Sequence, residues 1–325
     1  SCTWHAELRV AWLPASAKRN YAGRVRLRST PERGYVTQDA MAPVPYHSAP
    51  MRIIVTGCNG TVGRGAAERL VAGDHEVVGV DIAALAGRPH RVHIGDLRNP
   101  MEIHRAIDSA GWVPDAIVHL ANHRNAEAGP AEMVLRENLG MNASVFIAAK
   151  ELGVGRVVFS SSVQAALGGI EREVKGEGPV LPERVPIDES VTPRPTNSYG
   201  LSKLLTERML DGLATTVGAK DSGPFSAVSL RLPWVLGDQQ FQWAVERGAP
   251  TPNLWGLTEG FAYIHIADAS EAILRAVEQP ITGHEVFWIV ASDTRPVEPI
   301  AELVDRAYPA GPGARECIGR GALYD

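Results

Sequence analysis

The chain has 325 residues, of which 45% are hydrophobic and 21% are charged, and its formal net charge is −5. This length is enough for one large or two modest globular domains, and so small a net charge gives no reason to expect a nucleic acid or an acidic membrane surface as a partner. The three cysteines are scattered, which argues against a disulfide framework, and the ten histidines show no ligand spacing, which argues against a metal site. No apolar run approaches the roughly 18 residues that a membrane span requires. We therefore expect a cytoplasmic protein.

Residues 1–50 differ from the rest of the chain. They are rich in arginine and proline and show little periodicity, which predicts a poorly ordered extension. A presequence is the alternative, because such segments are rich in arginine and poor in acids. Glu7, Glu32 and Asp39 interrupt that pattern, and no amphipathic helix emerges.

A strand, a glycine turn and a helix follow from residue 51. Ile53, Ile54 and Val55 form the short apolar run of a strand that is buried on both faces. A turn with three glycines, Gly57, Gly60 and Gly63, then leads into a segment with helical periodicity. A helix N-terminus entered through glycines presents free N–H groups to an anion, so the segment predicts a pyrophosphate site, although the spacing G-x-x-G-x-x-G is not the commonest one.

A second strand is predicted over residues 76–81, and it ends in Asp81. An acid about 20 residues beyond the glycines is placed to bind the hydroxyls of a ribose. Because a carboxylate repels a 2′-phosphate, Asp81 favours NAD over NADP. The alternative is a residue that only forms a turn at the strand end.

Strands and helices then alternate, which predicts an α/β fold with a doubly wound parallel sheet of the Rossmann type over residues 51–232. Ligands in such sheets bind beyond the carboxyl ends of the strands. Residues 168–197 are predicted to be a lid loop, and residues 233–325 to form mainly a smaller substrate-binding part, with 262–279 packing back on the Rossmann domain. The strands are expected over 91–94, 114–121, 156–162, 226–231 and 285–290, and the helices over 101–110, 132–152, 199–217, 262–278 and 300–307.

Tyr199 and Lys203 lie four residues apart at the start of a predicted helix, so they share one face. A nearby ammonium stabilises a phenolate and lowers the pKa of a tyrosine toward the working range of a base. Ser162, at the end of the fifth strand, can donate a hydrogen bond to the same substrate oxygen. The three side chains predict a site that removes a proton from an alcohol as hydride leaves the carbon.

Taken together, seven blocks in this order resemble the extended short-chain dehydrogenase/reductase superfamily, NAD-dependent epimerase/dehydratase type. The blocks are Thr56-Gly57-x-x-Gly60-x-x-Gly63, Asp81, Asp96-Leu97, His119-Leu120-Ala121, Ser160-Ser161-Ser162, Tyr199-x-x-x-Lys203 and Tyr263-Ile264-His265-Ile266-Ala267-Asp268.

The resemblance implies NAD as cofactor and assigns roles by position. The expected pyrophosphate contacts are Gly57, Asn59, Gly60, Thr61, Val62 and Gly63. The other expected cofactor contacts are Asp81 at the adenosine ribose, Asp96 and Leu97 at the adenine, Leu120, Ala121 and Ser160 along the cleft, and Pro233 near the carboxamide. Tyr199 is the implied acid/base, Lys203 binds the nicotinamide ribose, and Ser162 polarises the substrate oxygen. Asn138 either matches an asparagine of the family or is a buried structural amide. Members of the family usually form homodimers that pack through the two long helices, so the resemblance also implies a homodimer.

Departures from the family bear on the substrate. The asparagine and arginine that usually meet a substrate diphosphate are absent from Arg231-Leu232-Pro233-Trp234 and from Gly260-Phe261-Ala262, and the paired carboxylates of the dehydratases are replaced by Val163-Gln164. These features resemble the members that act on sugars without a nucleotide, such as aldose or uronate dehydrogenases.

We therefore expect an NAD-dependent oxidoreductase acting on a small sugar-like substrate. Arg231 and Trp234 are candidate substrate contacts, with a structural salt bridge and a core position as their respective alternatives. A nucleotide-sugar epimerase and a non-catalytic NAD-binding scaffold are the alternative functions.

Overall fold

The computed structural model describes residues 4–7, 24–27, 49–168, 182–215, 224–242 and 259–292, with residues 302, 305 and 324. Its centre is a seven-stranded sheet in the order β11-β8-β7-β6-β3-β4-β5, in which every neighbouring pair is parallel. The strands are β3 (Arg52–Thr56), β4 (Glu76–Asp81), β5 (Arg91–Ile94), β6 (Ala116–His119), β7 (Arg156–Ser162), β8 (Ser226–Leu232) and β11 (Gly283–Trp288).

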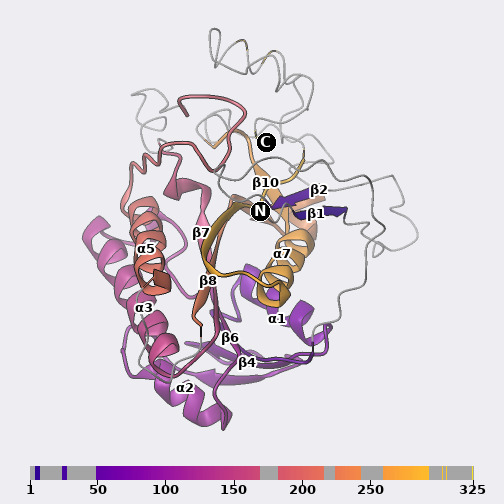
Figure 1. Ribbon diagram of the computed structural model, residues 1–325, viewed down its shortest axis with the longest axis vertical. Coiled ribbons are helices and arrows are strands. Elements are labelled where there is room, and N and C mark those ends of the chain that lie inside the picture. The colour runs from indigo at the N-terminus through magenta and orange to yellow at the C-terminus, as the bar shows by residue number, and fades with distance from the viewer. Residues whose placement is uncertain are drawn as a thin grey trace.

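Helices cover both faces of this sheet (Figure 1). On one face lie α1 (Thr61–Val71) and α7 (Ile266–Glu278), which pack against each other. On the other lie α2 (Glu102–Ala110), α3 (Ala131–Glu151) and α5 (Ser198–Thr215). The predicted doubly wound Rossmann-type fold is confirmed.

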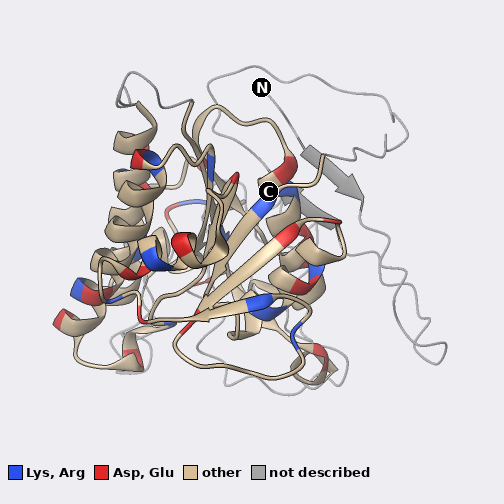
Figure 2. Cartoon of the chain, turned by 90° about the horizontal axis from the view of Figure 1, so that it is seen from below, with Lys and Arg blue, Asp and Glu red and all other residues tan. Residues whose placement is uncertain are grey.

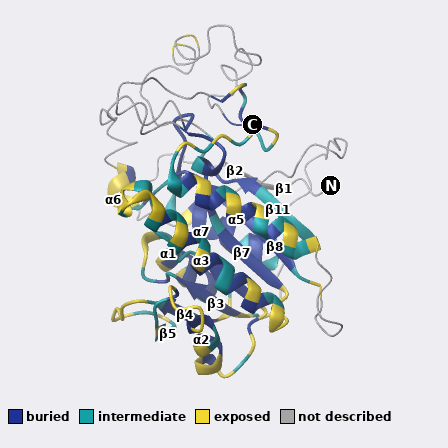
Figure 3. Cartoon of the chain, turned by 90° about the vertical axis from the view of Figure 1, so that its left-hand side faces the viewer, coloured by how far each residue is buried: buried dark blue, intermediate teal, exposed yellow. Residues whose placement is uncertain are grey.

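The central strand β3 shows why this arrangement forms. Successive side chains of a strand point to opposite faces. Ile53 and Val55 accordingly enter the apolar core beneath α1 and α7, whereas Ile54 enters the core beneath α2, α3 and α5. All three side chains are fully buried, and β3 lies among the strands coloured as buried at the centre of Figure 3. A continuous apolar run therefore fits only a strand that is covered on both sides.

The start of one helix differs from the sequence-based expectation. The helix expected from residue 262 begins only at Ile266, because β10 (Tyr263–His265) comes first and pairs with β9 (Trp234–Leu236). Within the predicted extension of residues 1–50, β1 (Trp4–Glu7) and β2 (Arg24–Leu27) form an antiparallel pair. The helix expected over 300–307 lies mostly outside the described residues. The remaining short elements are η1 (Ala126–Ala128), η2 (Val163–Ala165) and α6 (Asp238–Phe241).

The described part of the predicted lid, residues 182–197, is packed rather than loose. Val185, Ile187 and Val191 are buried in an apolar cluster with Trp288 and Tyr324. This cluster holds the segment against the end of β11. Residues 169–181 of the predicted lid lie outside the described residues.

Charged side chains of both signs are interspersed over the helices of the described part (Figure 2). Among the described residues, no helix combines the length and the apolar character that crossing a membrane requires.

Arg156, the first residue of β7, connects this end of the sheet to α7 through hydrogen bonds. Its guanidinium is buried and donates to the Ser226 hydroxyl at 2.8 Å. It also donates to the backbone carbonyls of Ala276 at 2.7 Å, Gln279 at 3.0 Å and Ile281 at 3.2 Å. One side chain thus joins β7 to β8, to the end of α7 and to the connection that follows α7.

We expect Arg156→Met to lower the free energy of unfolding by about 3 kcal/mol, because it leaves three buried carbonyls without their donor. The matched control is Arg208→Met, since Arg208 is exposed and, among the described residues, its one ion pair is with the half-exposed Asp211. That change should cost no more than about 0.5 kcal/mol. Urea denaturation followed by circular dichroism measures both, and equal losses for the two variants would contradict the assignment.

Candidate active site

The glycine turn between β3 and α1 is bare of side chains because the backbone leaves no room for them. Gly57 has a φ of 67°, in the left-handed region that favours glycine. A Cβ on Gly63 would lie 2.0 Å from the Gly57 carbonyl oxygen, and a Cβ on Gly57 would lie 2.9 Å from the backbone nitrogen of Ala121. The turn therefore packs directly against the end of β6.

The N-terminus of α1 fits an anion. Its N-cap residue, Gly60, makes no side-chain hydrogen bond, and the first turn of the helix holds no acid. Thr61 is exposed and Val62 half-buried. The N–H groups and the positive end of the helix dipole are thus free of side-chain acceptors from the helix itself, as a pyrophosphate requires.

Asp81, at the end of β4, lies beside this turn. Its Oδ2 accepts from the backbone N–H of Asn59 at 2.9 Å and its Oδ1 from that of Ile82 at 2.8 Å. The Asn59 side chain in turn donates to the carbonyl of Ala83 at 2.5 Å. The carboxylate is fixed at the glycine turn and only partly buried, which fits binding of ribose hydroxyls.

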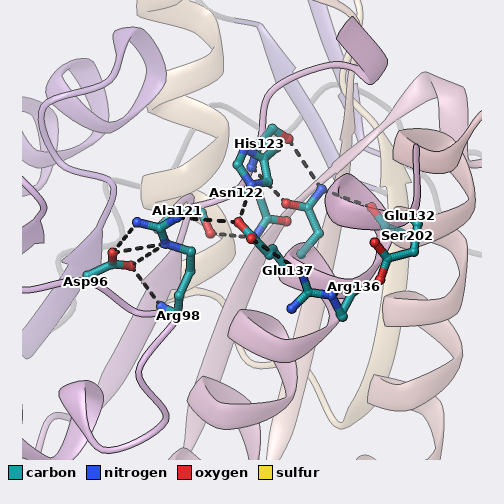
Figure 4. Close-up of polar contacts among 10 residues, drawn as sticks. Asp96, Arg98, Ala121, Asn122, His123, Glu132, Arg136, Glu137 and Ser202 are labelled. Carbon is teal, nitrogen blue, oxygen red and sulfur yellow. Dashed lines mark hydrogen bonds and ion pairs between the residues drawn. The ribbon is translucent and has the colours of Figure 1, made fainter. Parts of the chain in front are cut away.

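The expected adenine contacts differ in exposure. Leu97 is buried in the core beneath α2 and α3, whereas Asp96 is only partly buried. Arg98 donates from Nε to Oδ1 of Asp96 at 3.0 Å and from Nη2 to Oδ2 at 2.5 Å, and these bonds lower the pKa of the Asp96 carboxyl. Arg98 also lies 3.7 Å from Glu137, which pairs with His123 at 2.9 Å (Figure 4).

Asn138 joins this group of residues to α5. Its Oδ1 accepts from the backbone N–H of His123 at 2.8 Å, and its Nδ2 donates to the Ser202 hydroxyl at 3.1 Å. Ser202 donates in turn to the carbonyl of Tyr199 at 2.7 Å. Asn138 is fully buried and acts as a structural amide that orients the first turn of α5.

Lys203 lies on the buried face of α5, one turn after Tyr199. Its Nζ donates to Oδ1 of Asn122 at 2.8 Å and to the carbonyl of Ser160 at 2.7 Å. It also lies 4.7 Å from the centre of the Phe159 ring. Burial lowers the pKa of Lys203 to about 7.

Tyr199 and Ser162 come together as expected, since hydrogen bonding from Ser162 is among the influences on the pKa of Tyr199. The Nζ of Lys203 lies 5.4 Å from the centre of the Tyr199 ring. The pKa of Tyr199 is nevertheless raised to about 12, mainly by burial, although the bond from Ser162 opposes the shift. In the protein without a bound cofactor, desolvation of Tyr199 has a larger effect on its pKa than the nearby ammonium of Lys203. The expected lowering of the Tyr199 pKa by Lys203 is therefore not seen.

Arg231 forms a buried ion pair within the fold. Its Nε and Nη2 bind the two oxygens of Glu207 at 3.0 and 2.8 Å, and Ser161 donates to the same carboxylate at 2.6 Å. The guanidinium also lies 5.0 Å from the centre of the Trp288 ring. Of the two roles left open for Arg231, the structure shows the salt bridge.

The remaining expected contacts lie at the ends of two strands. Leu120 is half-buried at the end of β6, and its N–H donates to the Thr56 carbonyl at 3.2 Å. Pro233 is buried between β8 and β9, and Trp234 is half-buried in β9, where it lies opposite Tyr263.

Two residues that the sequence did not single out complete the site. Asn122 follows directly after β6, so the rule that ligands bind where parallel strands end could have identified it. Glu259 is distant in sequence from α5, the helix that carries Tyr199, and no local sequence pattern identifies it as a site residue. In the described part of the chain, no cluster of His, Cys, Asp and Glu side chains could hold a metal ion.

Comparisons with known proteins agree with this geometry. The profile of the NAD dependent epimerase/dehydratase family matches residues 53–289. The chain is 30% identical to a UDP-glucose 4-epimerase of Streptomyces lividans over 282 residues, which are 78% of this chain and 80% of that enzyme. It is 28% identical over 190 residues to an L-arabinose 1-dehydrogenase (NAD(P)(+)) of Haloferax volcanii, covering 57% of this chain and 67% of the relative.

The crystal structure of MoeE5 in complex with UDP-glucuronic acid and NAD shares the fold, with a TM-score of 0.58 and 20% identity over 84% of this chain and 94% of that one. The family match includes the glycine turn, Asp81 and the helix with Tyr199 and Lys203. NAD is thus the cofactor, and the chain belongs to the NAD-dependent epimerase/dehydratase family of the extended short-chain dehydrogenase/reductase superfamily.

Proposed function

We propose that this protein is an NAD-dependent oxidoreductase that transfers hydride at a secondary alcohol, ketone or lactol carbon of a sugar-like substrate without a nucleotide. The observation that carries the proposal is the placement of the buried Lys203, which binds Asn122 and the Ser160 carbonyl and lies one helix turn after Tyr199, 5.4 Å from the centre of its ring. A scaffold that only binds NAD has no need of an acid/base beside the cofactor site.

The residues of the glycine turn would hold the pyrophosphate, Asp81 the adenosine ribose and Lys203 the nicotinamide ribose. When bound, NAD accepts or returns the hydride, and its charged ring favours a nearby phenolate. The helix dipole at α1 and the fixed carboxylate of Asp81 support this placement.

In oxidation, the Tyr199 phenolate would take the proton of the substrate hydroxyl, and Ser162 would hold the same oxygen by a hydrogen bond. In reduction, the Tyr199 hydroxyl would return that proton. Because burial raises the pKa of Tyr199 to about 12, oxidation is expected to accelerate as the pH rises toward that pKa.

The substrate side supports a sugar without a diphosphate. Arg231 is already paired with Glu207, and Gln164 and Glu259, which are hydrogen-bonded to each other beside Ser162, carry no positive charge. A diphosphate is normally bound by charged donors.

A nucleotide-sugar epimerase is the second candidate, and the similarity to the Streptomyces lividans enzyme favours it. Such an enzyme would retain NAD through purification and form no net NADH. A UDP-sugar would then raise the melting temperature more than the free sugar does.

We expect Tyr199→Phe to lower the rate of NADH formation by about 10²- to 10⁴-fold, because the general base is lost while the cofactor contacts remain. NADH absorbance over a panel of free aldoses measures the rate, and quenching of tryptophan fluorescence measures the Kd for NAD, which should stay within about twofold. Ser109→Ala, an exposed change on α2, is the control. Unchanged NADH formation in Tyr199→Phe would refute the proposal.

We also propose a homodimer packed through α3 and α5. These neighbouring helices expose Ile147, Leu201 and Leu205, at 44%, 37% and 42% of their surface. Leu205→Glu is expected to halve the mass found by light scattering, because it places a charge in an apolar interface. Met101→Glu alters an equally exposed apolar residue at the start of α2 and should leave the mass unchanged, whereas a monomeric wild type would contradict the proposal.

A further inference from the structure

We propose that Glu259 is a specificity-determining residue, which keeps this site for uncharged sugars and excludes sugar acids and sugar phosphates. The inference rests on the proposed function and adds the charge class of the substrate.

The Glu259 carboxylate lies near the end of β7, the strand that carries Ser162, although Glu259 is distant from this strand in sequence. Glu259 is buried, with 7% of its surface exposed, and its Oε1 accepts from Nε2 of Gln164 at 2.8 Å. Gln164 lies two residues after Ser162, and its backbone N–H donates to the Ser162 hydroxyl at 3.2 Å. Glu259 and Ser162 are therefore linked through a single residue.

The same glutamine connects Glu259 to the helix that carries Tyr199. The Oε1 of Gln164 accepts from Nδ2 of Asn197 at 3.0 Å. Asn197 in turn accepts from the backbone N–H of Gly200 at 2.7 Å. Tyr199 lies between these two residues, so the network fixes the carboxylate relative to the phenol.

The backbone around Glu259 holds it in place. The next two residues, Gly260 and Phe261, both adopt the left-handed conformation, with φ of 60° and 55°. Such a conformation is strained at a phenylalanine, and it persists where the surrounding structure imposes it. Here the Glu259 carbonyl accepts from the Ala262 N–H at 3.2 Å and from the Tyr324 hydroxyl at 2.8 Å, and the Phe261 side chain is buried.

The charge of Glu259 reaches Tyr199, since it is the described charged group that raises the pKa of this tyrosine beyond the effect of burial. The other charged group facing the phenol in the described part is Lys203, on the same helix. A substrate carboxylate or phosphate close to the reacting carbon would meet a like charge in a site of low dielectric constant, which disfavours it. A sugar hydroxyl can instead donate to the carboxylate, whose two oxygens have about four acceptor positions.

The first test compares kcat/KM for a neutral aldose with kcat/KM for the corresponding uronate. Glu259→Gln is expected to reduce the preference for the neutral sugar by about tenfold or more, because the like charge is removed. Glu259→Asp, which keeps the charge, should retain the preference. Glu132→Gln, an exposed change on α3, is the control. An unchanged preference in folded Glu259→Gln overturns the proposal.

The second test needs no substrate. The pKa of Tyr199 can be followed by NMR of protein labelled with [¹³Cζ]tyrosine, with the resonance assigned by its loss in Tyr199→Phe. Glu259→Gln should lower this pKa, since a negative charge is removed, and Ser162→Ala should raise it, since a bond to the phenolate is lost. The acid limb of the pH–rate profile should move in the same directions. A pKa that stays unchanged in Glu259→Gln overturns the proposal.

The two tests separate the inference from the function on which it rests. If the wild-type protein oxidises no free sugar, the proposed function fails, while the NMR titration still decides whether Glu259 acts on Tyr199. If Glu259→Gln does not fold, Gln164→Leu removes the donor that holds the carboxylate. A preference for neutral sugars that is unchanged in that variant also counts against the proposal.

Discussion

The site depends on an unusual docking of α5, whose buried face is polar. Ser202, Lys203, Thr206 and Glu207 are all buried there. Buried polar groups are costly unless they are hydrogen-bonded, and each of these has partners on other elements or on the helix itself. Glu207 pairs with β8, Lys203 reaches the ends of β6 and β7, and Ser202 meets α3. Since a rotation of the helix would break these bonds together, they fix the direction in which Tyr199 points.

This docking also explains why the pKa values of Tyr199 and Lys203, the groups proposed for catalysis, are strongly shifted. Burial that holds Lys203 in place lowers its pKa to about 7, and burial raises the pKa of Tyr199 to about 12. The protein alone therefore keeps the phenol protonated. Ser162 and Glu259 then act on that phenol in opposite directions, so the working pH of the site is set by neighbours from two different segments.

Local patterns predicted the parts of the fold that depend on local physics. The glycine turn, Asp81 and the pairing of Tyr199 with Lys203 follow from spacing along one strand or one helix turn. The ion pair of Arg231 and the role of Asn138 remained open, because each depends on a partner from another element. Glu259 was not predicted at all, since its hydrogen bond to Gln164 and the left-handed turn at Phe261 are tertiary features that no local pattern encodes. The start of α7 was placed too early for a similar reason, because the pairing of β10 with β9 is a tertiary contact.

We propose that hydride passes from a sugar carbon to NAD and that the resulting NADH leaves the enzyme. The most direct measurement uses an aldose deuterated at its reacting carbon, with free NAD, and determines deuterium in the released NADH by mass spectrometry. The account predicts one deuterium in each NADH formed and a slower reaction than with the unlabelled sugar. Deuterium that returns to the sugar with no net NADH would contradict it and would indicate an epimerase.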